Sequence, residues 1–511
     1  MPEPAPGVAE REYESLKTKR NSALMRARSC AELTLPSLVP PEGHNQTQTF
    51  VQPYQSLGAR CVNHFASRLL ITLFAPNQRG FRLQIPPDKK AKMPTEQAPE
   101  YEKGLAAAEQ LIQEEIEGMR FRPALYYALR LLLISGNAVV YNPKGGRPKV
   151  YALPNFVCQR DGSGNLIQLI TTEAVDRKNL PAEIEKVIAA DVTKRDKRDV
   201  TIYTHVMRES PTKWVQYQEV CGIEIPESRG TFSDDGTPWL ALRWGRIDGE
   251  DYGRGLVEEY FGDLKSVEGL SKALLLAALA TAKVLFLVDP GGVTKSKDVE
   301  RASLSVVPGR AQDVGVLRVD KMGDFNVSKS VLDDTVQRLA FAFLLNSAIQ
   351  RQGERVTAEE IRYMANELEN AHGGVYALLA EELQLYFVNL AMERLRAKGA
   401  LPSALNSNNV RPLILTGLDA LGRAADVARM DQLLAGAAEL VGPANLEKYV
   451  DWGEYLTRRA IGLGVDGANL IRTREQIEAI ETTAQQQQML QTATGPAAQV
   501  AARALTEQQT Q

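Results

Sequence analysis

Few residues of this chain have the types and spacing that catalysis needs. Residues 291–296 come nearest to a phosphate-binding loop, but no glycine stands directly before Lys295. Glu258 likewise occupies the position at which a dinucleotide-binding motif starting at Gly253 would need its third glycine. Neighbouring carboxylates such as Glu359 and Glu360 point about 100° apart on a helix, which does not suit paired acid–base work. The sequence therefore predicts no catalytic residue and argues against a nucleotide-driven motor.

Cysteines and histidines show no metal-ligand spacing. The chain has four of each, without a CxxC pair or an HExxH pattern. The cysteine spacing suggests no disulfide framework, so we interpret these residues as buried or incidental thiols in a reducing compartment. We expect neither a metal nor another cofactor. The cysteines are Cys30, Cys61, Cys158 and Cys221, and the histidines are His44, His64, His205 and His372.

The overall composition is that of a core-forming protein with little net charge. Of the 511 residues, 44% are hydrophobic and 6% are aromatic, and the formal net charge is −3. This balance argues against a wide basic surface that grips nucleic acid, although nucleic acid could still slide past. The N-terminus lacks the charged and apolar regions of a signal peptide, and the longest apolar run, residues 273–288, is interrupted by Lys283. We expect no signal peptide and no membrane segment.

The most informative stretch is residues 333–395, where apolar spacing predicts a helix, a charged break and a longer helix. The longer helix opens with a capping box, in which Thr357 and Glu360 each accept a hydrogen bond from the other's backbone N–H group. Gly373 and Gly374 lie inside this helix, and two helical glycines favour a kink. The charged break consists of Gln350, Arg351, Gln352, Gly353, Glu354 and Arg355.

We predict an α+β fold in which helices predominate. The strands are expected mainly in the first half of the chain. Helical spacing of apolar residues comes first, and period-two alternation follows it. The Gly- and Asp-rich residues 161–165 predict the turn of a hairpin. Helices are expected over 11–33, 55–74, 101–117 and 123–134. Strands are expected over 81–85, 138–141, 149–153, 156–159, 166–171, 200–207, 214–219, 221–225 and 240–244.

The second half predicts a helix, a small insert and another helix. Helical spacing begins at residue 255 and runs to about 283, strands are expected at 285–288 and 314–319, and helix resumes at about 331. Beyond residue 400 the chain is Ala-rich and is expected to be helical to about 480. Residues 485–511 are of low complexity, for which disorder and a helical continuation both stay open.

Four sets of residues along the chain together resemble one known family. The first holds 36–38 and 55–60, the second 159–161, the third 248–255, 258–260 and 262–264, and the fourth 345–362, 373–376 and 382–385. In this order they resemble portal proteins, the head-to-tail connectors, of short-tailed phages of the autographivirus type. The resemblance spans roughly residues 10–425, and no single set is a catalytic signature.

The resemblance implies a subunit of a closed ring of twelve copies. In such a ring each subunit has wing, stem, clip and crown parts. Mapped onto this sequence, the implied parts are the wing (1–257), the first stem helix (258–283), the clip (284–330), the second stem helix (331–349), the tunnel loop (350–356), the long kinked helix of the wing (357–399), the crown (400–484) and the low-complexity tail (485–511).

The resemblance also gives the charged break a role. It implies a tunnel loop in which Arg351 and Arg355 face DNA, whereas an ordinary exposed loop between two helices would explain the same residues on their own. A channel for moving DNA should be lined mainly by acidic or neutral groups, because every cation bound to a phosphate deepens a binding well. Candidates for that lining are Glu359, Glu360, Lys265 and Lys272, with Glu367 and Glu369 as further acidic residues nearby.

The implied function is mechanical, and no enzymatic activity is expected. The ring would nucleate head assembly, pass double-stranded DNA during packaging and ejection, and connect head to tail. Implied partners are further copies of the chain, DNA, the terminase large subunit, the tail adaptor, the major capsid and scaffolding proteins and the internal core proteins. The implied location is the capsid vertex of the virion, after assembly in the bacterial cytoplasm. The alternatives are a packaging-motor ATPase, which would need the missing phosphate loop, and a tail or collar protein without a DNA channel.

Overall fold

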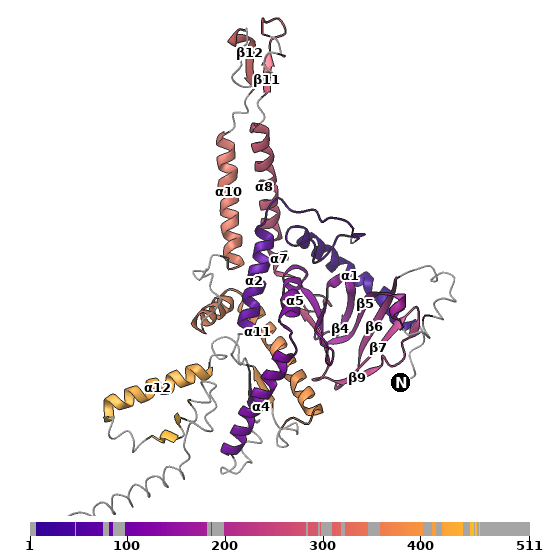
Figure 1. The fold of residues 1–511 in the computed structure, drawn as a ribbon, viewed down its shortest axis with the longest axis vertical. Helices are drawn as coiled ribbons and strands as arrows, with labels where there is room; N and C mark the ends of the chain where they lie inside the picture. Colours follow the sequence, from indigo (N-terminus) through magenta and orange to yellow (C-terminus); the bar gives the residue numbers. More distant parts are fainter. Residues whose placement is uncertain are drawn as a thin grey trace, which may run out of the picture. The chain divides into compact units, whose positions relative to one another are not determined.

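The computed structural model describes most of the chain between residues 7 and 442 (Figure 1). The chain divides into two compact units between Gly417 and Leu418. Helix α12 (Gly422–Val441) belongs to the second unit, and the other elements named below belong to the first. The described residues are 7–45, 47–74, 81–84, 98–180, 185, 199–282, 285–294, 297, 309–317, 322–345, 358–401, 411–414, 422–442, 450–453, 455–456 and 459.

Four helices of the first unit share one hydrophobic core. Phe65 and Leu69, four residues apart on α2, are both fully buried, as helical spacing requires. The Phe65 ring meets Trp244 and Phe343 edge-on, with ring centres 6.0 and 6.1 Å away. The sequence prediction is confirmed for these helices within three residues at each end. They are α1 (Val8–Glu32), α2 (Leu57–Leu73), α4 (Ala98–Gly118) and α5 (Arg122–Ser135).

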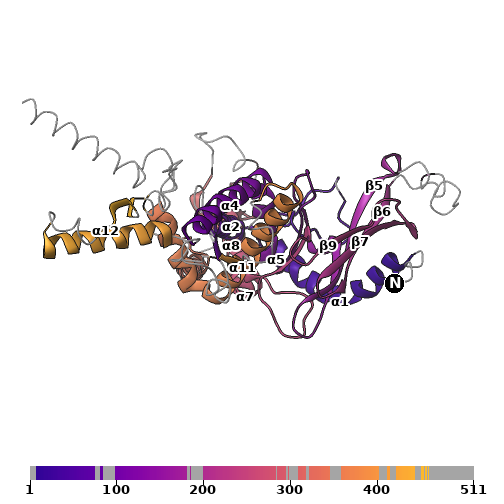
Figure 2. The ribbon, with the colours of Figure 1, turned by 90° about the horizontal axis from the view of Figure 1, so that it is seen from below.

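An antiparallel sheet follows these helices in the chain. Its strands are β4 (Phe156–Arg160), β5 (Leu166–Asp176), β6 (Asp199–Ser210), β7 (Lys213–Val220) and β8 (Ile223–Glu224), with β9 (Gly230–Ser233) paired to β7. Helix α1 runs alongside this sheet (Figure 2). Arg20 of α1 donates to the carbonyl oxygens of Pro154 and Phe156 at 2.8 and 3.1 Å. The helix and the sheet are thus joined by polar as well as apolar contacts.

Two smaller sheets connect distant parts of the first unit. Strands β10 (Trp239–Arg243), β2 (Asn137–Tyr141) and β3 (Lys149–Tyr151) form one of them. In the other, β1 (Phe81–Gln84) pairs with β13 (Arg411–Ile414). The expectation of helix throughout residues 400–480 is therefore wrong at β13. Pro412, opposite Leu83, lacks the N–H group that a helix interior needs, and it is tolerated in a short strand pair.

A helical hairpin ends in a two-stranded ribbon (Figure 1). Helix α8 (Phe261–Ala282) leads into β11 (Leu285–Val288), and β12 (Val314–Leu317) leads back into α10 (Met322–Ala342). Asp263 and Arg338 form an ion pair at 3.1 Å, which sets these two positions opposite each other in the antiparallel pair. Helix was expected to begin at 255, but the short α7 (Leu256–Glu259) ends at Tyr260 before α8 begins. Helix α10 starts at Met322, ahead of the predicted residue 331, although its first half is polar and lacks the apolar spacing from which helices were predicted.

The end of α10 also differs from the expectation. Helix was expected to continue to residue 349, but it ends at Ala342. The N–H groups of Leu344 and Leu345 bond back to the carbonyl oxygens of Phe341 and Ala340 at 3.1 and 2.7 Å, which is a Schellman motif. Leu344 takes the left-handed conformation, with φ of 54°. Glycine normally fills that position, so the sequence contains no recognisable stop signal there.

Candidate functional site

The structure describes only some of the residues that the sequence singled out. Glu359 and Glu360 belong to the first turn of α11 (Ala358–Ala397), and their side chains lie outside the described part of the chain. Gly373 and Gly374 lie inside the same helix, which runs through both positions. The angle of a bend there stays a prediction. The charged-break residues outside the described part are Gln350, Arg351, Gln352, Gly353, Glu354 and Arg355.

Lys265 and Lys272 lie on one flank of α8, because seven residues make about two helical turns. Both residues are exposed. The Lys272 ammonium group lies 5.3 Å from the centre of the Tyr54 ring, which is a cation–π contact within the same chain. Lys272 therefore contacts an aromatic ring of its own subunit. The channel-lining role of both lysines stays a prediction.

Residues 33–56, which join α1 to α2 and which we call the strap, are fastened to α8 beside this lysine. The carboxylate of Glu268 accepts the backbone N–H groups of Tyr54 and Gln55, at 2.9 and 3.3 Å, with one oxygen for each. The side-chain oxygen of Gln55 accepts the N–H group of Gly58 at 2.8 Å. Gln55 thus provides the first turn of α2 with the acceptor that an N-cap side chain usually supplies.

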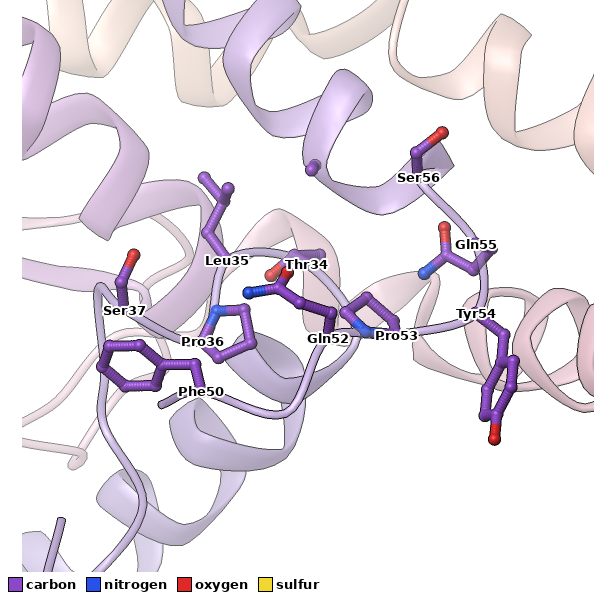
Figure 3. A pocket seen from close by; sticks show the side chains of 11 residues that line it. Thr34, Leu35, Pro36, Ser37, Phe50, Gln52, Pro53, Tyr54, Gln55 and Ser56 are labelled. Carbon is purple, nitrogen blue, oxygen red and sulfur yellow. The ribbon is translucent and has the colours of Figure 1, made fainter. Parts of the chain in front are cut away.

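A pocket of about 420 Å³ opens in the strap (Figure 3). Its wall combines two prolines and two aromatic residues with five uncharged polar residues of the Ser, Thr and Gln types. Beside the pocket, Phe50 stacks on His44 with the ring centres 4.0 Å apart. None of the lining residues is charged, so the pocket offers shape without a general acid or base. The lining residues are Thr34, Leu35, Pro36, Ser37, Phe50, Gln52, Pro53, Tyr54, Gln55, Ser56 and Ala59.

Two of the four sets that carry the family resemblance meet next to the start of α8. The backbone N–H group of Arg160 donates to Oδ1 of Asp251 at 2.7 Å, and its Nε donates to the Asp251 carbonyl oxygen at 3.2 Å. Close by, a Cβ atom added to Gly255 would lie 2.6 Å from the carbonyl oxygen of Leu133, which only glycine avoids. These residues fix the chain that leads into α7 and α8. These contacts give Arg160, Asp251 and Gly255 a structural role, and no single set had been interpreted as a catalytic signature.

Two side chains that the sequence showed only as members of a helix make polar contacts with the turn after α10 and with α11. Nε2 of His64 lies 3.1 Å from the carbonyl oxygen of Leu344, and Nε2 carries the proton because a carbonyl oxygen can only accept. Burial and the charge of Arg68 lower the pKa of His64, so the imidazole is neutral at pH 7. Nη1 of Arg68 lies 2.9 Å from Oε2 of Glu367 on α11. Glu367 was named among the acidic residues near the predicted channel lining, and that role stays a prediction, while the structure shows that its carboxylate pairs with Arg68.

The glycine-rich turn after β11 already contains a carboxylate. Oδ2 of Asp313 accepts the N–H groups of Val293 and Thr294 at 2.9 and 3.1 Å, and the Thr294 hydroxyl at 3.2 Å. In a phosphate-binding loop such N–H groups would face a phosphate. The negative charge of Asp313 would repel a phosphate at this turn, so the turn is not built as a nucleotide site.

Titratable groups elsewhere in the described part of the chain do not form a reactive centre. No three side chains able to hold a metal ion gather there. No helix among the described residues has the length and apolarity to cross a bilayer. Burial raises the pKa of Cys30 and Cys61 to about 12 and that of Cys158 to about 11. These thiols are protonated at pH 7, and a protonated thiol is a poor nucleophile.

Known proteins resemble this chain over most of its length. Residues 7–471 match the family model described as bacteriophage head to tail connecting protein. The chain is 37% identical over 482 residues to the portal protein of Escherichia phage T7, which covers 91% of this chain and 88% of that protein. It is 37% identical to the portal protein of Enterobacteria phage T3, covering 92% and 89%. It is 30% identical to the portal protein of Pseudomonas phage phiKMV, covering 93% and 94%.

Solved structures add a weaker likeness. A chain from the neck of a native gene transfer agent particle is 11% identical, with a TM-score of 0.34, and the match covers 80% of this chain and 89% of that one. The family assignment rests on the sequence relatives, whose own lengths are matched almost completely. This chain belongs to the family of bacteriophage head to tail connecting proteins.

Proposed function

We propose that this protein is the portal subunit of a short-tailed phage, and that twelve copies close into a ring at one capsid vertex. Double-stranded DNA passes through the ring during packaging and ejection. The observation that carries this proposal is the 37% identity to a portal protein over 91% of this chain and 88% of that protein. A match of this extent supports the same domain organisation in both proteins.

In this proposal the described elements take the parts of a portal subunit. Helices α8 and α10 are the two stem helices, and the ribbon of β11 and β12 with the chain between them is the clip. The segment 350–356 is the tunnel loop, and α11 is the long wing helix. Residues 1–257 form the wing, the crown covers 400–484, and β13 within that range pairs with β1 of the wing.

Ring formation is supported by exposed apolar residues on both helices of the stem hairpin. On α8, Leu275 and Leu279 are 49% and 55% exposed, and they are four positions apart, so they lie on one flank. On α10, Val327 and Val331 are 66% and 50% exposed and are related in the same way. Apolar flanks of this kind are normally covered in an assembled protein. A contact between two different flanks is heterologous, and such contacts form a ring when the rotation between copies closes and an open filament when it does not.

The charges of the two flanks also differ. The flank of α8 carries the exposed Lys265 and Lys272, whereas on α10 the exposed Asp334 lies seven residues after Val327, and the exposed Arg338 on the same flank is already paired with Asp263. When α8 of one copy lies against α10 of the next, the leucines and valines are buried together and the opposite charges approach each other. Two copies of the same flank would instead bring like charges together. The pairing of unlike flanks is therefore favoured over a two-fold dimer.

The remaining parts of the proposal follow from family membership. The tunnel loop with Arg351 and Arg355 faces DNA, and the clip contacts the terminase large subunit and then the tail adaptor. The wing contacts the major capsid and scaffolding proteins, and internal core proteins bind above the channel. The ring is assembled in the bacterial cytoplasm and stays in the virion.

Electron microscopy of the purified protein, with particle mass measured in parallel, tests this proposal. We expect end-on views of twelve-fold rings with an open centre and a mass of twelve 56.3-kDa chains. Rings of eleven or thirteen copies would keep the channel but overturn the count. A persistent monomer, or a particle without a central channel wide enough for a duplex, would contradict the proposal.

A further inference from the structure

Helix α2 touches the stem hairpin and α11 with residues one turn apart. His64 reaches the carbonyl oxygen of Leu344, directly after α10, and Arg68 reaches Glu367 on α11. Residues four positions apart lie on the same face of a helix. A single face of α2 therefore contacts the end of one neighbouring helix and the body of another.

Both contacts are partly buried. The Arg68 side chain is only 5% exposed and the carboxylate side chain of Glu367 is 23% exposed, so little solvent screens their attraction. Leu344 is buried, and its left-handed backbone conformation aims the carbonyl oxygen that His64 contacts. Loss of either partner would leave a buried polar group without its present bond.

The two ends of α2 are also tied by polar contacts. At the N-terminal end, the Glu268 carboxylate on α8 holds the strap at Gln55. At the C-terminal end, the Gln384 side chain on α11 donates to the carbonyl oxygen of Leu73 at 2.7 Å. Helix α2 thus makes side-chain hydrogen bonds with α11 at two points, with α8 through the strap, and with the turn that ends α10.

We propose that α2 is a coupling strut that fixes the position of α11 relative to the stem hairpin, with His64 and Arg68 as its positioning residues. Displacement of the hairpin is then passed to α11 through these two side chains rather than absorbed between the helices. The apolar packing of Phe65 against Phe343 adds stiffness but lacks the directionality of the polar contacts. The inference rests on the proposed function only where it names the hairpin as a stem.

The test measures a distance between spin labels on the two elements that the strut connects. Gln337 on α10 and Ala371 on α11 are exposed, so Gln337→Cys and Ala371→Cys provide label sites in a Cys221→Ser background, where the other native thiols are buried. Labelled chains are diluted with unlabelled chains before assembly, so that only distances within one chain are read. We expect one narrow distance distribution in the parent protein.

Variants of the strut then decide the matter. Arg68→Glu or Glu367→Arg alone should at least double the width of the distribution, and the double variant Arg68→Glu/Glu367→Arg should restore it. His64→Phe should broaden it, whereas His64→Gln, which keeps an N–H donor, should broaden it less. If the single variants melt at lower temperature but keep the narrow distribution below melting, both residues only stabilise the fold and the strut is refuted.

Two controls keep the outcomes separate. Circular dichroism shows whether a single variant is folded, and Arg68→Gln provides a milder disruption where the charge-reversed chain is not. The distance is read within one chain, so it tests the strut whether or not rings form. Absence of rings in micrographs of the parent protein would instead count against the proposed function alone.

Discussion

The carboxylate of Glu219 on β7 caps helix α1, accepting the backbone N–H group of Ala9 at 3.0 Å although 210 residues separate the two. Its other oxygen accepts the N–H group of Glu10 at 3.2 Å. The N-cap residue Gly7 has no side chain to do this, and Glu219 is only 2% exposed. The helix thus receives from the sheet both an acceptor and a negative charge at its positive end.

Glu219→Ala should therefore loosen the start of α1. We expect a loss of about 1–3 kcal/mol in the free energy of local opening, because two N–H groups lose a charged acceptor. Hydrogen exchange of the amides in the first turn of α1 measures this directly. Glu219→Gln is the matched control, since it keeps one acceptor and should lose less. Equal exchange rates in the alanine variant and the parent would show that water replaces the cap at no cost.

His205 should make the stability of the protein depend on pH. It is 1% exposed on β6, and its Nε2 lies 3.0 Å from Oε1 of Gln168, which can only accept. Nδ1 therefore accepts the hydroxyl proton of Tyr217, also at 3.0 Å. Burial lowers the pKa of His205 from 6.5 to about 4. Between these two pH values the unfolded chain takes up a proton that the folded chain does not.

The stabilising effect of the neutral histidine is thus complete above about pH 6.5 and is lost as the pH falls towards 4. The loss amounts to at most about 3 kcal/mol. Thermal unfolding at pH 7 and pH 5 should show a larger fall for the parent than for His205→Gln, which cannot titrate. An identical pH dependence in both proteins would mean that other groups control acid stability.

Much of the fold can be predicted from apolar spacing, because its signal is local. Helix α5 and the hairpin of β4 and β5 carry their own periodicity and turn residues. The end of α10 could not be predicted, since Leu344 takes a conformation that the chain usually reserves for glycine. Strand β13 could not be predicted either, because its partner β1 lies more than 300 residues earlier.

The candidate site shows the same division between local and distant information. The helical spacing of His64 and Arg68 is visible in the sequence, but their partners Leu344 and Glu367 lie 280 and 299 residues away. No spacing rule connects such distant positions. The resemblance to a family identified the function, whereas the contacts of α2 with Leu344 and with α11 became visible only in the folded chain.

A disulfide between subunits should report the proposed contact of α8 with α10. The ion pair of Asp263 with Arg338 sets these positions level. Leu275 lies twelve residues after Asp263 and Val327 eleven residues before Arg338, so these two exposed residues lie at nearly the same height on the hairpin. In a ring whose subunits are related by rotation alone, residues at equal height in neighbouring copies can meet. Leu275→Cys/Val327→Cys should therefore give a ladder of covalent multimers after oxidation.

The single variants Leu275→Cys and Val327→Cys are the controls. A contact between unlike flanks places each new thiol opposite a native leucine or valine, so each single variant should run as a monomer on a denaturing gel. A ladder from Leu275→Cys alone would indicate a two-fold contact between like flanks. Rings in micrographs combined with no ladder from the double variant would place the subunit contact elsewhere.

Removal of the two arginines of the predicted tunnel loop should change how DNA is held without changing the ring. If Arg351 and Arg355 touch phosphates, Arg351→Gln/Arg355→Gln loses two cation–phosphate contacts in every subunit that faces DNA. The slope of log affinity against log salt should then become shallower by about two per such subunit. The amount of nuclease-protected DNA in filled heads, measured after packaging, should be lower than in the parent, or DNA should leave the filled heads faster.

A control with the same change in charge separates this effect from bulk electrostatics. Lys144 and Arg147 lie exposed in the turn between β2 and β3, so Lys144→Gln/Arg147→Gln removes two positive charges outside the loop. Only the loop variant should alter DNA retention if position matters. Equal effects from both variants would indicate a general attraction between the ring and DNA. Loss of rings in the loop variant would show that these arginines hold subunits together, and the ordinary-loop interpretation would replace the DNA-facing one.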